Sequence, residues 1–360
     1  MKKLKTGCAY HGNRMLSHAI VDMKEIARAD MDIVVHMLSH TDWERHDKVM
    51  GDIFKASEAE GLEVWVDNWG LGGMPGDKSH FLSYHPEAHM QYGDGVMHPY
   101  QVCLNAPSYR QFVKDWLDKV AELGGKTAIW DEPQIPLPHV EGTTTNERYS
   151  CCSCPECKKL FREKYEREMP LHIDAEVGEF RTDTIMDFFT FITDHAASLG
   201  MKNVVNPIPQ LLEGFTDNDS RNKYQKFTIE RLLSVPHIDN VGTDPYWYDM
   251  TKDHCAYDFV YGISKKLIAA TDKAEKDHSI WIQGYNIPSG REEELFLGTA
   301  AAYDAGARTI LSWSFHAGES NTYRCENPER AWAYTVDAFR SVKSMERAKI
   351  IEENRKKYRK

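Results

Sequence analysis

The fold is decided by a short apolar stretch near the middle of the chain, Lys126-Thr127-Ala128-Ile129-Trp130-Asp131-Glu132-Pro133. Two glycines precede it and close a predicted helix, and a proline stops it. A short apolar run is typical of a strand buried on both faces of a parallel sheet. The two acids at its end therefore belong to the carboxyl edge of a predicted sheet, where ligands and catalytic groups gather in α/β proteins. The alternative is that they are ordinary loop or cap acids.

The same pattern of strand, polar loop and amphipathic helix recurs about every 40 residues, which is typical of βα units. Besides the stretch above, the predicted strands are residues 6–10, 32–36, 62–67, 203–206, 238–243, 279–283 and 309–313. Eight strands alternating with helices predict an α/β protein, a (β/α)8 TIM barrel that occupies residues 1–360 as a single domain. A doubly wound sheet is the competitor, but no Gly-rich phosphate-binding motif follows the first strand.

Long loops are expected after the third and fourth strands, without a strand-rich insertion. The first loop is rich in Gly and His and reaches Asn105, which is predicted to cap a helix that has Pro107 in its first turn. The second contains the cysteine-rich segment and is expected to form an insertion over residues 134–175.

Composition limits the classes of partner. The formal charge of −11, from 44 basic and 55 acidic residues, argues against binding to nucleic acid or to an anionic membrane surface. No apolar run approaches the roughly 18 residues that a membrane helix needs. The first residues also lack an apolar signal region, so a soluble cytoplasmic protein is the expectation.

Polar and aromatic side chains crowd the predicted strand ends. Aromatic rings stack on the apolar faces of sugars, and amides and carboxylates bind their hydroxyls, so this rim suits a carbohydrate. The alternative for any single aromatic residue is an ordinary lid on the barrel core. The candidate substrate-binding residues are Tyr10, His11, His36, Asp67, Trp69, Trp130, Asn206, Tyr246, Trp247, Gln283, Tyr285, Trp313 and His316.

Cysteines form the second strong signal. Cys151, Cys152, Cys154 and Cys157 fall within seven residues, and Cys103 precedes an earlier helix. One loop with this spacing can offer several thiolates to a tetrahedral metal, which predicts structural zinc. A disulfide or free thiols are the alternatives, although the expected cytoplasmic setting disfavours a disulfide.

Residues 100–165 resemble the zinc-bearing β-galactosidases of glycoside hydrolase family 42. The resemblance rests on the segment that runs from Cys103 through Asn105, Pro107 and Arg110, on the strand-four acid, and on the later Cys-x-Cys-x-x-Cys. It implies a structural Zn²⁺ and no organic cofactor. The implied zinc ligands are Cys103, Cys152, Cys154 and Cys157, with Cys151 spare or replacing one of them.

The same resemblance implies that Glu132 is the general acid/base of a glycosidase. The family has Asn where this chain has Asp131, and a neighbouring carboxylate can raise the pKa of a proton donor by like-charge repulsion. The chain departs from the family at strand seven, where Gln283 stands in place of a nucleophilic Glu. The usual retaining mechanism with two carboxylates is therefore not matched.

Two other mechanisms fit a glycoside hydrolase. Asp244 on strand six is one candidate for the second carboxylate, as base or nucleophile. Alternatively, the adjacent Asp131 and Glu132 resemble family 20 hexosaminidases, in which Asp orients the acetamido group of the substrate as nucleophile. Both mechanisms depend on Glu132.

Two rival functions remain open. Imidazoles and carboxylates that converge on the barrel mouth would predict a metal-dependent TIM-barrel hydrolase or isomerase. The candidate histidines are His11, His36 and His316 at separate strand ends, and His80, His85, His89 and His98 in the loop after the third strand. Gln283 instead favours a carbohydrate-binding barrel without catalysis. The family resembled often forms oligomers, so the resemblance allows a homo-oligomer.

Overall fold

The computed structural model describes residues 3–67, 79–93, 95–131, 152–171, 174–213, 227–250 and 255–358. Eight parallel strands form a closed barrel in the order β1-β10-β9-β8-β7-β6-β3-β2. The strands are β1 Lys5–Tyr10, β2 Ile33–Met37, β3 Glu63–Asp67, β6 Thr127–Asp131, β7 Lys202–Asn206, β8 Asn240–Thr243, β9 Asp277–Gln283 and β10 Thr309–Trp313. Each predicted strand matches one of these to within a few residues, and the (β/α)8 barrel is confirmed.

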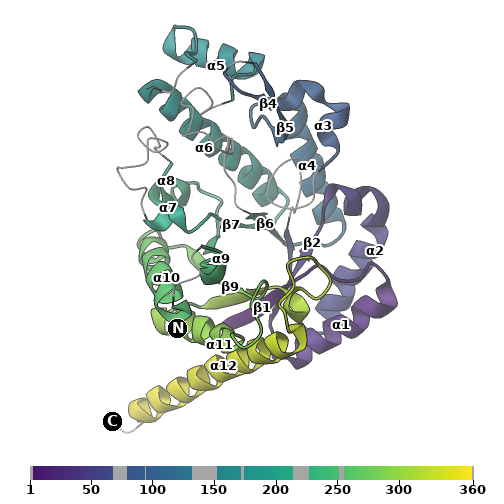
Figure 1. The fold of residues 1–360 in the computed structure, drawn as a ribbon, viewed down its shortest axis with the longest axis vertical. Coiled ribbons are helices and arrows are strands. Elements are labelled where there is room, and N and C mark those ends of the chain that lie inside the picture. The colour runs from purple at the N-terminus through teal and green to yellow at the C-terminus, as the bar shows by residue number, and fades with distance from the viewer. Residues whose placement is uncertain are drawn as a thin grey trace.

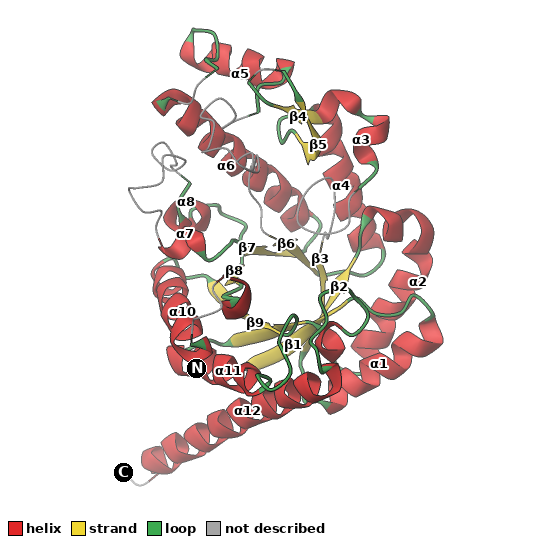
Figure 2. Ribbon diagram, in the orientation of Figure 1, coloured by secondary structure: helices red, strands yellow, loops and turns green. Residues whose placement is uncertain are grey.

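Helices surround the strands, which form a ring in Figure 2. The longer ones are α1 Leu16–Arg28, α2 His40–Ala59, α4 Pro107–Glu122, α6 Ala175–Ser198, α10 Ala256–Lys273, α11 Glu293–Ala305 and α12 Pro328–Tyr358. The short ones are α5 Pro155–Tyr165, α7 Gln210–Glu213, α8 Ile229–Leu233 and α9 Trp247–Met250. Among the described residues, no helix has the length and apolar character needed to span a membrane.

The segment after β3 differs from the prediction of a loop without strands. Its described part contains α3 Phe81–Tyr84, the 3-10 turn Pro86–Ala88 and an antiparallel hairpin of β4 His89–Gln91 and β5 Met97–Val102. This hairpin lies beside α5, away from the ring of strands (Figure 1). Along β5 exposed and partly buried residues alternate up to Tyr100, and the last two residues are buried, a pattern that the Gly- and His-rich composition obscured.

Asn105 does not cap α4, contrary to the sequence prediction. The N-cap is Ala106, and Pro107 is in the first turn as expected. The Asn105 side chain instead donates to Cys157 Sγ at 3.4 Å and to Thr184 Oγ1 at 3.2 Å. Its amide is therefore committed to contacts with α5 and α6.

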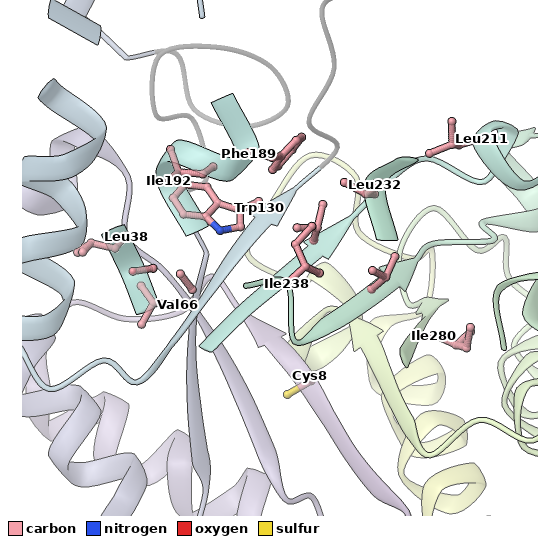
Figure 3. Close-up of a cluster of buried hydrophobic side chains, with 14 of the residues drawn as sticks. Cys8, Leu38, Val66, Trp130, Phe189, Ile192, Leu211, Leu232, Ile238 and Ile280 are labelled. Atoms are coloured by element: carbon pink, nitrogen blue, oxygen red, sulfur yellow. The ribbon is translucent and has the colours of Figure 1, made fainter. Parts of the chain in front are cut away.

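The core has an outer and an inner part because side chains alternate along each strand. The outer part packs the strands on the helices, as Figure 3 shows for Trp130, which lies with Phe189 and Ile192 of α6. The inner part fills the barrel and comprises Ala9, Ile33, Val35, Met37, Trp65, Ile129, Val204, Trp281 and Leu311. This alternation decides which strand-end residues face the mouth of the barrel.

Candidate functional site

The carboxyl end of the barrel brings together polar residues that continue the inner rows. Asp67, Asp131, Asn206 and Gln283 each stand two positions after an inner-core residue of their own strand. The period of two therefore directs their side chains to the barrel interior. Asp67, Asn206 and Gln283 are buried, and Asp131 is partly exposed.

Asp131 and Asn206 are paired directly across two strands. They are register partners at the ends of β6 and β7, and Asn206 Nδ2 donates to Asp131 Oδ1 at 3.3 Å. The neighbouring strand approaches closely at Gly242, where a Cβ would stand 2.3 Å from Asn206 Oδ1. A glycine at this position therefore leaves room for the amide.

Asp244 lies just beyond the end of β8 and is 3 % exposed. Gly242, two positions earlier, lies beside the inward-facing Asn206, so the same alternation directs Asp244 inward. Tyr246 packs against the inner core, as Trp313 of β10 does. The carboxylates of Asp67, Asp131 and Asp244 and the indole ring of Trp313 thus all belong to this end of the barrel.

Four of the predicted substrate-binding residues face the helices instead. Tyr10 donates to Asp22 of α1 at 2.6 Å, and His36 Nε2 lies 2.9 Å from Ser57 Oγ of α2. The indole nitrogen of Trp130 donates to Asn203 Oδ1, and that of Trp247 donates to Glu294 Oε2. Because strands of a parallel barrel are apolar on both faces, the sequence did not reveal this orientation.

Gln283 is held by protein contacts at both ends of its amide. Its Oε1 accepts from the Tyr248 backbone at 2.9 Å, and its Nε2 donates to Asp249 Oδ1 at 3.2 Å. Tyr285 donates its hydroxyl to the other oxygen of Asp249 at 2.5 Å. The end of β9, which is the seventh strand of the barrel, thus carries an amide that binds the carboxylate of Asp249 in α9.

Asp249 was not predicted from the sequence. It lies in a helix of four residues that follows β8, and no motif distinguishes it from other surface acids. Its contacts with Gln283 and Tyr285 place Asp249 beside the end of β9, and only the tertiary structure shows them.

His11 and His316 both line a pocket of about 240 Å³ whose wall also includes Asn13, Asp22 and Phe315. The His11 ring meets Trp313 edge-on at 4.7 Å, and burial lowers the His11 pKa to about 4, so the ring is neutral near pH 7. His316 Nε2 lies 2.7 Å from Glu25 Oε1 of α1. With His36 turned to Ser57, the three strand-end histidines of the metal-dependent alternative point to different partners.

A hollow of about 850 Å³ lies at the opposite end of the barrel. It is lined by the first residues of several strands, including Lys5, Glu63, Thr127 and Thr309. The amino-terminal face of such barrels contributes to stability, whereas catalytic groups lie at the carboxyl ends. The candidate site is therefore assigned to the mouth that contains Asp131.

Three sequence-predicted residues, Trp69, Glu132 and Cys151, lie outside the described residues. The same holds for most of the expected insertion at 134–175, of which 152–171 and 174–175 are described. Its described part contains α5 and the start of α6.

The described cysteines of the predicted zinc site form one buried cluster. The Sγ atoms of Cys103, Cys152, Cys154 and Cys157 all lie within 4.8 Å of one another. Cys103 Sγ is 3.4 Å from Cys157 Sγ and 3.5 Å from Cys154 Sγ. Four sulfurs about 2.3 Å from a common zinc would be roughly 3.8 Å apart, so this cluster has the dimensions of a tetrahedral site with four thiolate ligands.

The surrounding contacts suit thiolate ligands. The backbone N–H of Cys157 and the amide of Asn105 donate to sulfur atoms of the cluster. Hydrogen bonds among the thiols lower the pKa of Cys154 well below its usual range and raise the pKa values of Cys103 and Cys157, so one thiolate is shared by its neighbours. The backbone of Ser153 donates to Gln91 of β4, which joins the cysteine segment to the hairpin. The cluster could bind a metal. Cys157 belongs to α5 and Cys103 directly follows β5, and both elements lie away from the strand ring (Figure 1).

Comparisons with known proteins agree on the fold. No family model and no curated protein sequence matches the chain. A β-galactosidase from Bacillus circulans sp. alkalophilus has a TM-score of 0.62 at 14% identity, over 94% of this chain and 56% of that chain. An endo-1,4-β-mannanase from Rhizomucor miehei has a TM-score of 0.61 at 10% identity, over 95% of both chains. The GH5_18 protein from Streptomyces cattleya, solved in complex with GlcNAc, has a TM-score of 0.62 at 11% identity, over 95% of this chain and 80% of that chain.

These structures establish a shared barrel fold. The chain spans little more than half the length of the β-galactosidase, whereas it spans nearly all of the mannanase. At such low identity the chemistry must be inferred from the site itself.

Proposed function

We propose that this protein is a glycoside hydrolase that acts on a glycoside or oligosaccharide. The observation that carries the proposal is the Asp131–Asn206 pair at a barrel mouth that also contains Asp67, Asp244 and Trp313. Carboxylates, amides and an aromatic ring at one end of a barrel are the groups that bind sugar hydroxyls and sugar faces. The barrel neighbours, which include a β-galactosidase and a mannanase, support the same class.

In this proposal Glu132 is the general acid/base. It directly follows Asp131, and the family 42 resemblance gives it that role. A general acid must donate a proton to the leaving oxygen, and a carboxylate neighbour favours retention of that proton at neutral pH. Asp131 accepts a hydrogen bond from the Asn206 amide, a contact that suits an ionised carboxylate beside a protonated Glu132.

Either Asp131 or Asp244 supplies the second carboxylate. Gln283 cannot form a glycosyl ester, and its amide is engaged by Tyr248 and Asp249. Asp244 would act as a base or nucleophile, whereas Asp131 would orient an acetamido group of the substrate. The Streptomyces neighbour with bound GlcNAc makes N-acetylhexosaminides a reasonable class to include among test substrates.

The test is a screen of aryl glycosides, with galactosides and N-acetylhexosaminides of both anomers, followed by variants. We expect Glu132→Gln to reduce turnover of a good substrate by about 10²–10⁴-fold. If this variant retained near wild-type turnover, Glu132 would not be the general acid. Loss of activity in Asp131→Asn with little effect of Asp244→Asn would select substrate assistance, and the reverse result would select Asp244.

A carbohydrate-binding barrel without catalysis is the second candidate function. The observation that favours it is the engagement of Gln283, which leaves the strand-seven position without a nucleophile. Binding of an oligosaccharide with no turnover, unchanged in Glu132→Gln, would support this candidate.

We also propose that the four-cysteine cluster binds a structural Zn²⁺. Four protein ligands complete a tetrahedral site and leave no position for substrate. The ion would join β5 and α5, the elements next to Cys103 and Cys157, and so stabilise the outlying hairpin. Among the described residues of the insertion, this is the role that the cysteine segment fits best.

A further inference from the structure

His40, Glu44 and His80 form a second cluster of potential metal ligands. One ligand atom from each lies within 4.8 Å of the others. His40 and Glu44 are four residues apart on α2, so their side chains share one helix face. His80 precedes α3 and approaches the same face from a different part of the chain.

One carboxylate oxygen is shared by the two imidazoles. Glu44 Oε1 lies 2.9 Å from His80 Nε2 and 3.5 Å from His40 Nε2. The two rings are stacked, with centroids 4.0 Å apart and planes at 11°. Two imidazole Nε2 atoms and one carboxylate oxygen are thus close enough together to bind a single ion.

A hydrogen bond outside the cluster orients His40. Its Nδ1 lies 2.8 Å from Ser79 Oγ, and this oxygen also accepts from the backbone N–H of Phe81. In the tautomer in which Nδ1–H donates to Ser79, the Nε2 lone pair is free to bind a cation beside Glu44. Ligating histidines in metalloproteins are usually fixed by such a contact of the second ring nitrogen.

The cluster combines a rigid side with an accessible one. The His40 side chain is 10% exposed and packs edge-on against Phe112 of α4. The side chains of His80 and Glu44 are 36% and 44% exposed. His80 and Glu44 can therefore turn toward an ion that enters from solvent, while His40 stays fixed by packing.

We propose that His40, Glu44 and His80 form a binding site for a divalent transition-metal ion, with Zn²⁺ as the best match. Two imidazoles and one carboxylate suit zinc, and three protein ligands leave a coordination position for water. The site is distinct from the four-cysteine cluster. It would tie α2, which begins near the mouth of the barrel, to the segment that contains His80.

The experiment measures zinc binding to the full chain with the four cysteines unchanged. Protein is dialysed against Zn²⁺, and bound metal is quantified by elemental analysis and calorimetry. After dialysis we expect wild type to retain one equivalent of zinc more than His80→Ala or Glu44→Gln. In calorimetry the affinity of each variant for this additional ion should be at least about 10-fold weaker than that of wild type. His85→Ala is the matched control, because His85 is also exposed and pairs with a glutamate, Glu87, outside the cluster.

A second measurement uses Co²⁺, whose thiolate charge-transfer bands report the cysteine cluster separately. These bands should be the same in wild type, His80→Ala and Glu44→Gln.

A third measurement is thermal unfolding. Addition of Zn²⁺ should raise the Tm of wild type and of His85→Ala beyond the rise seen in Glu44→Gln, because a ligand that binds the native state stabilises it. Equal stoichiometry in wild type and His80→Ala, or equal loss in His85→Ala, would overturn the proposal. The contacts among the three residues would then be a surface ion pair only.

Discussion

Gln283 Nε2 donates to Asp249 Oδ1 at 3.2 Å and joins the end of β9 to the short helix α9. The Asp249 carboxylate therefore faces the amide donor of Gln283, which stands where the family resemblance would place a nucleophilic Glu. The amide keeps both its hydrogen-bonding ends satisfied, since Tyr248 donates to its oxygen.

Gln283→Glu should destabilise the protein by about 1–3 kcal/mol, because it removes a buried donor and places a second carboxylate beside Asp249. The double variant Gln283→Glu/Asp249→Asn should recover much of this loss, since the new amide can donate to the new carboxylate. Chemical unfolding of the three proteins provides the measurement. Equal stability of Gln283→Glu and wild type would show that the Asp249 contact is unimportant.

Gly242→Ala should disrupt the Asp131–Asn206 pair. A Cβ at this position would stand 2.3 Å from Asn206 Oδ1 and 2.7 Å from Ser279 Oγ, so the amide must move. We expect a loss of about 1–3 kcal/mol in the free energy of unfolding and reduced turnover of any glycoside substrate.

Gly262→Ala is the control for that variant. Gly262 lies in α10, and a Cβ there would contact nothing within 4 Å. Alanine in a helix should be neutral or stabilise by up to about 1 kcal/mol. Similar destabilisation by both substitutions would contradict the proposed role of the close approach at Gly242.

Asn105→Ala should weaken retention of metal by the four-cysteine cluster by about 10–100-fold, because Asn105 donates to Cys157 Sγ. Cys157→Ser should reduce retention further, since it removes a ligand. Competition with a chromophoric chelator measures both effects. Cys255→Ser, at an exposed cysteine outside the cluster, should retain metal as wild type does.

Acid should destabilise the protein through His36. Burial lowers the His36 pKa from 6.5 to about 3, so the folded state holds a neutral ring while the unfolded state takes up a proton below pH 6.5. The stabilising contribution is thus complete above pH 6.5 and is lost as pH falls toward 3. The loss is up to about 1.4 kcal/mol per pH unit in that window.

The test compares the pH slope of unfolding free energy in wild type and His36→Gln. The slope between pH 6.5 and 4 should be shallower in the variant, whatever its absolute stability. His18→Gln, at an exposed position of α1, is the control for removal of a histidine side chain elsewhere in the chain. An unchanged slope in His36→Gln would mean that His36 does not titrate on unfolding.

The order of strands and helices was readable from the sequence because buried parallel strands are short apolar runs separated by polar loops and amphipathic helices. The stretch from Thr127 to Asp131 was therefore placed correctly as a strand, which is β6. The hairpin β4–β5 was missed because a composition rich in Gly, His and Pro masks a short strand.

The sequence by itself determined the eight strands, the acids and amides at their ends, and the close spacing of Cys152, Cys154 and Cys157. Tertiary structure decided which of these groups meet. Trp130 and Asp131 are adjacent in the chain, yet the first packs on the helices and the second faces the mouth. Both faces of such a strand are buried, so hydropathy does not reveal orientation, and contacts such as Cys103 with Cys157 or Gln283 with Asp249 arise only when the barrel closes.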